Sequence, residues 1–379
     1  MHICFLTNEF PKEGFPHGGI GSFVKTIATA LVKKGIDVSI IGINYTQNDE
    51  TEIVEGVKVY RLKKSTVKGL SWYFNSKAIN KKIKQIHEHH SISIVESSEL
   101  GLAFISKIRE IKYVIRLHGG HHFFTLFENR PRENKKVWLE NRSFKKADYL
   151  VAVSEYVCQI TLRELNIEKR KVSIIYNPVD TSKFMQVDYS KAKPNSILIV
   201  GSVCEKKGVR QLIEALIIVK TKIPDVSLKI VGRDWFFPDG SSYIDYLSNY
   251  IVDEIKDAIT IVGAIPNTEI PRYIEQSEIC VNPSHMEAMP LAWLEVLSMG
   301  KQFIGSEIGP GFEIVTNKVT GLLCNPHNSK DIADKIIWML THKEESITMG
   351  LTARKDILKR FDVAILVQKN IKFYNEIIN

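Results

Sequence analysis

Short runs of β-branched and aliphatic residues alternate along the chain with longer segments of helical periodicity. In the first half such runs lie at 2–7, 38–43, 92–95, 113–117, 149–153 and 172–175, and 52–62 has the pattern of an extended pair. A second series lies at 197–200, 227–231, 259–262, 279–282, 303–304 and 322–324, before a helical tail from about 331. Strands that alternate with helices form parallel sheets with crossover helices, so the sequence predicts an α/β fold.

The length of the chain favours two domains. A chain of 379 residues is too long for one ordinary hydrophobic core. The two series of strands are separated by 181–194, which has little periodicity. We therefore expect a first domain over 1–180, a linker over 181–194, a second domain over 195–360 and a final helical segment over 361–379.

The composition is that of a soluble globular protein, with 44% hydrophobic and 25% charged residues. No apolar run reaches the roughly 18 residues that cross a bilayer, and the chain begins directly with a predicted strand rather than a leader. These features predict a cytoplasmic protein. The five cysteines are scattered singly, which indicates neither a disulfide framework nor a zinc site.

The net charge of +8 is carried by the first 190 residues and is densest between Lys58 and Lys84. This segment contains no acidic residue, and Trp72, Tyr73 and Phe74 lie within it. Basic residues beside aromatic ones suit a surface that lies against anionic lipid headgroups, but a solvated helix face has the same composition. Both interpretations remain open. Nucleic acid is not an expected partner, because no helix-turn-helix, RNA-recognition or zinc-finger pattern accompanies the segment.

Two glutamates, Glu287 and Glu295, lie on either side of a predicted helix start in VNPSHMEAMPLAWLEVLSMG. Pro290 is favoured at the first helical position, so we expect Glu287 in the loop after a strand and Glu295 about one and a half turns into the helix. Ligands of α/β proteins bind outside the carboxyl ends of the strands, where carboxylates accept hydrogen bonds from sugar hydroxyls. Glu295 has apolar neighbours and needs a polar partner. The alternative is a solvated loop glutamate and an ordinary helix-surface glutamate.

Each predicted domain begins with a strand, a glycine-containing turn and a helix. The first turn contains GGIG at 18–21, and the second contains Gly201 followed by Lys206, Lys207 and Gly208. Glycine permits close backbone approach, and the N–H groups of a helix start attract phosphate, to which a lysine adds a full charge. Ordinary turn glycines and surface lysines would explain either motif alone. Their occurrence in both domains favours phosphate binding.

Taken together, these stretches resemble glycosyltransferase family 4, the retaining enzymes of the GT-B fold. The resemblance covers nearly the whole chain: GGIG at 18–21, RLHGG at 116–120, VAVSEYV at 151–157, NPVD at 177–180, GSVCEKKG at 201–208, EAMPLAWLE at 287–295, GPGFEIV at 309–315 and TGLLCNP at 320–326. It implies two Rossmann-like domains whose parallel sheets face a central cleft. The second domain would bind a nucleoside diphosphate sugar and the first the acceptor, with the C-terminal helix packed back on the first.

The resemblance also implies roles for particular residues. Glu295 corresponds to the residue that holds the ribose hydroxyls and Glu287 to the one that contacts the donor sugar. Lys207 would neutralise the diphosphate, the backbone of Gly19 would lie near the phosphates, and His118 would lie near the transferred sugar.

One position departs from the family pattern. Members usually carry arginine immediately after the glycine that corresponds to Gly201, but Ser202 stands here. The leaving group would thus lose one of two cations, which Lys206, Arg210 or Arg233 could replace. Arg233 is of interest because VGRDW also departs from the usual glycine-x-glycine.

The activity implied by the resemblance is that of a retaining hexosyltransferase in bacterial surface polysaccharide or lipopolysaccharide synthesis, at the inner face of the membrane. The acceptor would be a glycan or a lipid-linked sugar. The absence of an Asp-x-Asp motif predicts a metal-independent reaction, and no cofactor is expected beyond the nucleoside diphosphate sugar. Two alternatives are a non-catalytic nucleotide-sugar-binding relative that acts as a regulatory or scaffold module, and a Rossmann oxidoreductase or epimerase. The latter would need a tight G-x-G-x-x-G, which the first strand lacks.

Overall fold

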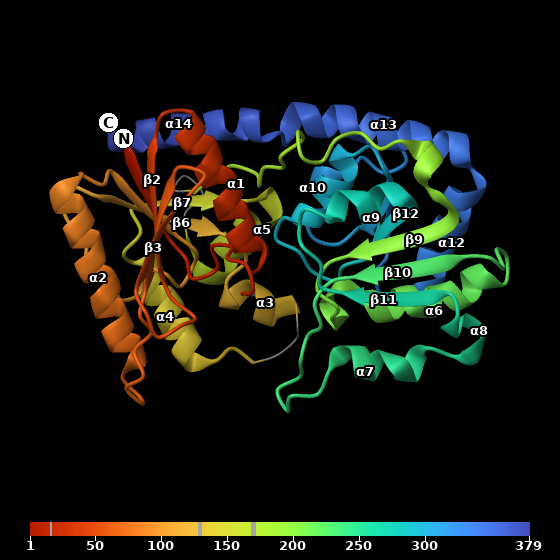
Figure 1. The fold of residues 1–379 in the computed structure, drawn as a ribbon, viewed down its shortest axis with the longest axis horizontal. Coiled ribbons are helices and arrows are strands. Elements are labelled where there is room, and N and C mark those ends of the chain that lie inside the picture. Colours follow the sequence, from red (N-terminus) through yellow and green to blue (C-terminus); the bar gives the residue numbers. More distant parts are fainter. Residues whose placement is uncertain (16, 128–130, 168–171) are drawn as a thin grey trace. The chain divides into compact units, whose positions relative to one another are not determined.

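The computed structural model describes residues 1–15, 17–127, 131–167 and 172–379. The chain forms two compact units (Figure 1). The first contains Met1–Pro178 and Val363–Asn379, and the second contains Val179–Asp362. Both are α/β structures built on parallel sheets, so the predicted fold class is confirmed.

The first unit has an eight-stranded sheet of order β3-β4-β2-β1-β5-β6-β7-β8. Its strands are β1 (His2–Leu6), β2 (Asp37–Ile43), β3 (Glu50–Val54), β4 (Val57–Leu62), β5 (Ile94–Ser97), β6 (Lys112–Leu117), β7 (Tyr149–Ala152) and β8 (Val172–Ile174). All neighbouring pairs are parallel except β3 and β4, which form the extended pair expected over 52–62. The central strand β1 is buried along its whole length, which explains the apolar sequence that follows His2.

Six helices of the first unit connect or cover these strands. They are α1 (Gly19–Lys33), α2 (Ser71–His89), α3 (His121–Phe127), α4 (Asn134–Phe144), α5 (Glu155–Leu165) and α14 (Val363–Ile378). Figure 1 shows α1 and α2 on opposite sides of the sheet. The C-terminal helix α14 belongs to this unit and packs against α1 through a face that includes Leu366, Phe373 and Tyr374.

The second unit has a six-stranded parallel sheet of order β11-β10-β9-β12-β13-β14. Its strands are β9 (Lys193–Val200), β10 (Ser227–Val231), β11 (Ile259–Gly263), β12 (Ser277–Asn282), β13 (Gln302–Ser306) and β14 (Leu322–Cys324). The α-helices are α6 (Val209–Lys220), α7 (Tyr243–Leu247), α8 (Asp253–Lys256), α9 (Ile270–Gln276), α10 (Leu291–Ser298), α11 (Gly311–Ile314), α12 (Ser329–Thr341) and α13 (Lys343–Arg360). One large hydrophobic core joins the sheet to α6 and α12.

The strand order of each sheet creates a switch point where successive connections run in opposite directions. In the first unit this point lies between β1 and β5, and in the second between β9 and β12. Ligands of open α/β sheets bind at such points, in the crevice outside the carboxyl ends of the strands. The topology therefore directs attention to the turns that follow β1, β5, β9 and β12.

The segment 181–194 differs from the linker expected there, because it lies within the second unit. Phe184 and Val187 are buried. The Val187 N–H donates to the Met299 carbonyl at 3.0 Å, and the Ser298 hydroxyl donates to the Phe184 carbonyl at 3.1 Å. Phe184 and Val187, spaced apolar residues in a segment without periodicity, thus attach it beside α10. The boundaries between the two units fall at residues 178/179 and 362/363.

The five cysteines are buried and unpaired with one another. Among the described helices, none combines the length and the apolar character needed to cross a membrane.

Candidate functional site

The turn that follows β9 packs directly against the loop that follows β12. A short 3₁₀ helix, η3 (Glu205–Lys207), ends at Gly208, whose φ of +71° is in the left-handed region. A Cβ atom on Gly208 would lie 2.0 Å from the Pro283 carbonyl oxygen. Glycine is therefore required here by both conformation and contact, and it brings the two sides of the switch point together.

Lys207 and Glu287 meet at this switch point. The Lys207 ammonium forms an ion pair with the Glu287 carboxylate, and their side chains are only 20% and 14% exposed. Lys207 comes from the turn after β9 and Glu287 from the loop after β12, eighty positions apart in the chain. A partly buried pair of opposite charges at the carboxyl edge of a sheet can exchange partners with a ligand that carries both hydroxyl groups and negative charge.

Glu295 lies inside α10, as predicted, but Pro290 occupies the N-cap position rather than the first helical position. The proline backbone is extended, with φ of −74° and ψ of 113°, so the helix begins one residue later. Burial raises the pKa of Glu295 to about 7, and the positive charge of Lys183 and a hydrogen bond from Asn267 oppose the rise. Sequence reasoning missed Lys183 and Asn267, because the first lies in the expected linker and the second in an ordinary polar loop.

Ser202 and Arg233 lie on adjacent backbone segments. Val203 and Asp234 form a parallel bridge, and the Val203 N–H donates to the Arg233 carbonyl at 2.8 Å. A Cβ atom on Gly232 would lie 1.6 Å from the Gly201 carbonyl oxygen, so the two turns are in close contact. The structure thus places the unusual serine beside the unusual arginine.

The three cations proposed to replace the missing arginine differ in their surroundings. Arg210 is held by Glu205 at 2.7 Å and by Glu214 at 2.6 Å. Lys206 accepts a hydrogen bond through its carbonyl from the His285 N–H at 2.8 Å. Arg233 is exposed, and its guanidinium has no hydrogen bond or ion pair within the described part of the chain. Of the three, Arg233 has the side chain most accessible to an anionic ligand.

In the first unit, the glycines before α1 have separate structural reasons. The Gly18 N–H donates to the Glu9 carboxylate at 3.0 Å, and a Cβ atom on Gly21 would lie 1.9 Å from the Glu9 carbonyl oxygen. A Cβ atom on Gly19 would meet no atom within 4 Å, and this residue is exposed. The backbone at the first residue of α1 is therefore open to solvent, as a phosphate-contacting position requires.

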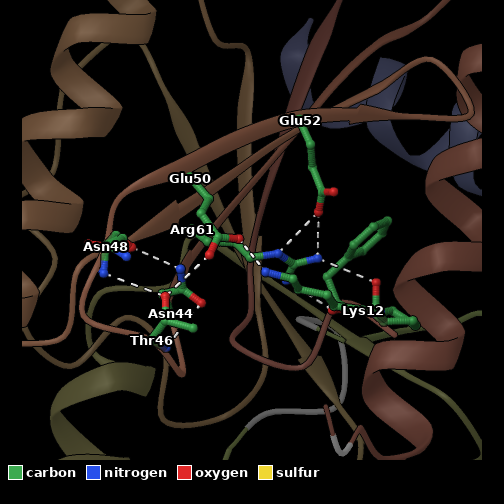
Figure 2. Close-up of polar contacts among 9 residues, drawn as sticks. Lys12, Asn44, Thr46, Asn48, Glu50, Glu52 and Arg61 are labelled. Carbon is green, nitrogen blue, oxygen red and sulfur yellow. Dashed lines mark hydrogen bonds and ion pairs between the residues drawn. The ribbon is translucent and has the colours of Figure 1, made fainter. Parts of the chain in front are cut away.

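The loop between β1 and α1 is anchored by the β3–β4 hairpin (Figure 2). Arg61 in β4 donates to the carbonyls of Phe10 and Pro11 at 3.0 and 3.3 Å, and to the Glu52 carboxylate at 2.8 Å. Lys12 forms an ion pair with Glu50 in the same hairpin. Arg61, one of the basic residues between Lys58 and Lys84, is only 5% exposed and so is unavailable to a lipid surface.

His118 directly follows β6 and lies beside α1. Its ring is 4.9 Å from that of Phe23 between centroids, in an edge-on arrangement. Burial and the positive charge of Arg116 lower the pKa of His118 to about 3. His118 is thus neutral at physiological pH, and it can exchange hydrogen bonds with a ligand without adding charge.

Buried titratable groups lie behind the His118 loop. The Glu99 carboxylate accepts a hydrogen bond from the His118 N–H, and burial raises its pKa to about 7. His122 bridges the Glu140 carboxylate at 2.8 Å and the Thr161 hydroxyl at 2.9 Å. A carboxylate, a histidine and a hydroxyl in this sequence of contacts resemble a hydrolytic triad. All three side chains are buried, however, so they stabilise the loop that contains His118 and do not contact a substrate. Sequence reasoning missed this cluster because no spacing connects its members.

Two family models match consecutive parts of the chain. The model described as Glycosyltransferase Family 4 matches residues 17–183, and that described as Glycosyl transferases group 1 matches residues 180–356. The chain belongs to glycosyltransferase family 4.

Relatives of this glycosyltransferase match it over most or all of its length. An uncharacterized glycosyltransferase of Methanocaldococcus jannaschii is 26% identical, with 97% of each chain covered. The UDP-Gal:alpha-D-GlcNAc-diphosphoundecaprenol alpha-1,3-galactosyltransferase of Escherichia coli is 27% identical, with 77% of this chain and 76% of the relative covered. The sucrose-phosphate synthase of Thermosynechococcus elongatus has a TM-score of 0.83 at 18% identity, with 99% and 98% covered, which supports the GT-B fold.

The predicted site residues of this glycosyltransferase fall into two groups. In the second unit, Lys207 contacts Glu287 and Ser202 adjoins Arg233, all at the carboxyl edge of the sheet, with Glu295 in the following helix. In the first unit, the helix that starts at Gly19 carries the phenylalanine that contacts His118. Each unit therefore presents polar groups at the carboxyl edge of its own sheet.

Proposed function

We propose that this family 4 enzyme transfers a hexose from a nucleoside diphosphate sugar to a glycan or lipid-linked acceptor, with retention of configuration and without a metal ion. The observation that carries the proposal is the Lys207–Glu287 pair at the switch point of the second unit. One side chain suits a diphosphate and the other suits sugar hydroxyls, and a nucleoside diphosphate sugar has both groups next to each other.

Donor binding in this proposal exchanges the partners of the ion pair. Lys207 moves its contact to the diphosphate, and Glu287 accepts hydrogen bonds from hydroxyls of the sugar. The exchange avoids a buried unpaired charge in either state, because each group has a partner before and after binding. The ionised carboxylate of Glu295 holds the ribose hydroxyls.

The departing diphosphate needs more positive charge than one lysine supplies. We assign the second cation to Arg233, because its backbone is paired with the turn that carries Ser202 and because Arg210 is held by two glutamates. The family resemblance implies a further contribution from the positive end of α1, where the backbone of Gly19 is exposed. Such prearranged charges stabilise an anion as it forms.

The transfer follows from these contacts. The bond between sugar C1 and the diphosphate oxygen breaks while positive charge develops on the ring, and the acceptor oxygen forms its bond to C1 from the same face. The acceptor hydroxyl proton passes to the departing diphosphate. Glu287 orients the sugar rather than attacking it, and neutral His118 contributes hydrogen bonds without adding charge.

A membrane-bound acceptor is supported by the Escherichia coli relative, whose name describes a diphosphoundecaprenol substrate. It is also supported by an aromatic surface of the first unit, in which half-buried Phe104 is accompanied by four exposed residues, Trp72, Tyr73, Phe74 and Trp138. Trp72 lies 4.5 Å and Trp138 6.0 Å from the Phe104 ring between centroids. Trp72 and Trp138 are 45% and 53% exposed, which is unusual for rings that gather in one place.

Basic residues lie close to these aromatic residues in the sequence. Lys63, Lys64 and Lys68 are exposed in the loop before α2, and Lys77 is exposed in the second turn of that helix. Because α2 follows β4, its first turn lies toward the carboxyl edge of the sheet, the edge that also carries His118 and Gly19. Tryptophan and lysine together suit the interface of an anionic bilayer, so we propose peripheral binding at the inner face of the membrane.

Transfer is tested by incubating the full-length protein with a panel of nucleoside diphosphate sugars and lipid-linked acceptors, with product anomers identified by NMR. We expect one donor of the panel, with an α-linked sugar, to give an α-linked product. The reaction should proceed in the presence of EDTA, because no metal ion is needed. Glu287→Ala should abolish transfer, whereas Glu307→Ala, an exposed loop control, should retain it. Donor binding without transfer or hydrolysis would instead favour the non-catalytic module, and unchanged turnover in Glu287→Ala would contradict the site.

Membrane binding is tested by co-sedimentation with vesicles of phosphatidylcholine alone or with phosphatidylglycerol. Trp72→Ala combined with Trp138→Ala should weaken binding, and Trp235→Ala, an equally exposed tryptophan of the second unit, should not. Replacing Lys77, Lys81 and Lys84 by glutamine should weaken binding only to the anionic vesicles. Equal binding by the lysine variant would refute the electrostatic part of the proposal.

A further inference from the structure

A buried polar network joins the C-terminal helix to the neighbouring strands β5 and β6 of the first unit. Arg116 in β6 donates from Nε to Glu96 of β5 at 2.6 Å and from Nη2 to Asn370 of α14 at 2.7 Å. The Tyr374 hydroxyl, also from α14, donates to Glu96 at 2.8 Å. None of the four side chains is more than 2% exposed.

Both α14 residues are specifically oriented toward this network. The Asn370 amide nitrogen donates to the Leu366 carbonyl at 2.8 Å, which turns its oxygen toward Arg116. The Tyr374 hydroxyl is also 3.4 Å from Arg116 Nη2. Burying a charged pair is costly unless its hydrogen bonds are satisfied, so α14 supplies groups that Glu96 and Arg116 need.

The network ends at His118. Arg116 is the penultimate residue of β6, and His118 lies in the bend directly after that strand. Phe23 of α1 lies between them, with its ring centroid 5.0 Å from the Arg116 guanidinium carbon and 4.9 Å from the His118 ring centroid. Phe23 is 1% exposed and so has little freedom to move independently of either neighbour.

We propose that Asn370 and Tyr374 are positioning residues for His118, acting through the Glu96–Arg116 pair and Phe23. This inference rests on the proposed role of His118 beside the transferred sugar. The hydrogen bonds of α14 fix the Arg116 guanidinium, which fixes the Phe23 ring and thereby the angle at which the His118 ring is presented. A misplacement of about 1 Å, caused by a change far from the reacting atoms, can lower a reaction rate by about a hundredfold.

The proposal explains a feature of the chain that folding alone does not require. A C-terminal helix can cover a sheet with apolar residues only, yet α14 places an amide and a phenol opposite a buried arginine. Hydrophobic replacements of buried ion pairs are often neutral or stabilising, so stability alone does not account for the polar contacts. A role in positioning accounts for them, because Arg116, which they hold, lies two residues before His118.

The test compares Tyr374→Phe, which removes one hydroxyl, with Phe373→Leu as a packing control on the same helix. The Phe373 ring lies 6.5 Å from the Tyr149 ring and 5.7 Å from the Tyr374 ring between centroids, so its replacement changes the packing beside Tyr374 without removing a hydrogen bond. In Tyr374→Phe we expect kcat to fall about tenfold with an unchanged donor KM, consistent with a misplaced group rather than lost binding. Phe373→Leu should lower the melting temperature and keep kcat.

A second readout follows the His118 ring directly. Its NMR signal in histidine-labelled protein, assigned by its loss in His118→Gln, should shift in Tyr374→Phe because the ring moves relative to Phe23. A wild-type kcat, an unmoved His118 signal, or an equal loss of kcat in Phe373→Leu would each overturn the proposal. If Tyr374→Phe does not fold, Asn370→Ser is judged by the same criteria. If the wild-type protein transfers no sugar, the proposed function fails, and the His118 signal alone decides this inference.

Discussion

Replacing Glu295 by glutamine is expected to weaken donor binding and to remove its dependence on pH. The carboxyl group lies in α10 among apolar residues, and burial raises its pKa to about 7 despite Lys183 and Asn267. In the proposed donor complex the ionised form accepts hydrogen bonds from two ribose hydroxyls, whereas the protonated form must first lose its proton. Donor binding by the wild-type protein should therefore tighten as the pH rises through 7.

The size of the effect follows from the pKa. At pH 6 about one tenth of the Glu295 groups are ionised and at pH 8 about nine tenths, so affinity should differ by roughly tenfold between these values. Glutamine keeps the shape but removes the charge. Hydrogen bonds to charged groups contribute about 1.5–3 kcal/mol, so Glu295→Gln should weaken binding roughly 10- to 150-fold at pH 8. At pH 6 the two proteins should differ much less.

Isothermal titration calorimetry with intact nucleoside diphosphate sugars is the appropriate assay. A free nucleotide would confuse the result because a terminal phosphate titrates near pH 6. Titrations in buffers of different ionisation enthalpy should show the wild-type protein releasing close to one proton at pH 6 and almost none at pH 8. Glu307→Gln, an exposed control, should behave as wild type. Equal wild-type affinity at both pH values, or retained pH dependence in Glu295→Gln, would refute the reasoning.

Three further substitutions test other parts of the structure. Ser202→Arg should tighten donor binding by roughly tenfold, since it restores a charge-assisted contact to the diphosphate; unchanged affinity by calorimetry would show that this charge is already supplied. Gly208→Ala should lower the free energy of unfolding by about 3 kcal/mol in urea titrations, because a Cβ atom there is strained at a φ of +71° and would lie 2.0 Å from the Pro283 carbonyl oxygen. Glu99→Gln should stabilise the protein at pH 8 but not at pH 4. The folded-state pKa of Glu99, about 7, exceeds the ordinary pKa of a glutamate. The free energy of unfolding of the wild-type protein therefore falls as the pH rises from the ordinary pKa to the folded-state pKa. Above that range it stays reduced by on the order of 3 kcal/mol. Equal melting temperatures of the two proteins at pH 8 would contradict this explanation.

The positions of the strands were predictable because their cause is local. An apolar run such as Ile3–Leu6 is expected wherever both faces of a strand are buried, and the structure places a central strand there. Glu287 and Glu295 could likewise be assigned to a loop and a helix from Pro290 alone. The one-residue error at the helix start reflects an extended proline that caps the helix instead of entering it.

Local patterns could not reveal which residues share a site. Lys207 meets Glu287 only because β9 and β12 are neighbours, and Ser202 adjoins Arg233 only because β9 also neighbours β10. Lys183 was assigned to a linker because its segment lacks periodicity, although spaced apolar side chains attach that segment to the second unit.

Burial distinguishes basic residues that the composition of the sequence cannot tell apart. Arg61 and Lys77 both contribute to the basic segment of the sequence, yet Arg61 is enclosed by the loop that it anchors and Lys77 is exposed. The order of residue types along the chain was thus sufficient for the fold class and the family, and it supports a proposal for the chemical type of ligand. Charge state, pairing and accessibility depend on which groups are brought together after folding, because desolvation and Coulomb energy are properties of the surroundings and not of the residue.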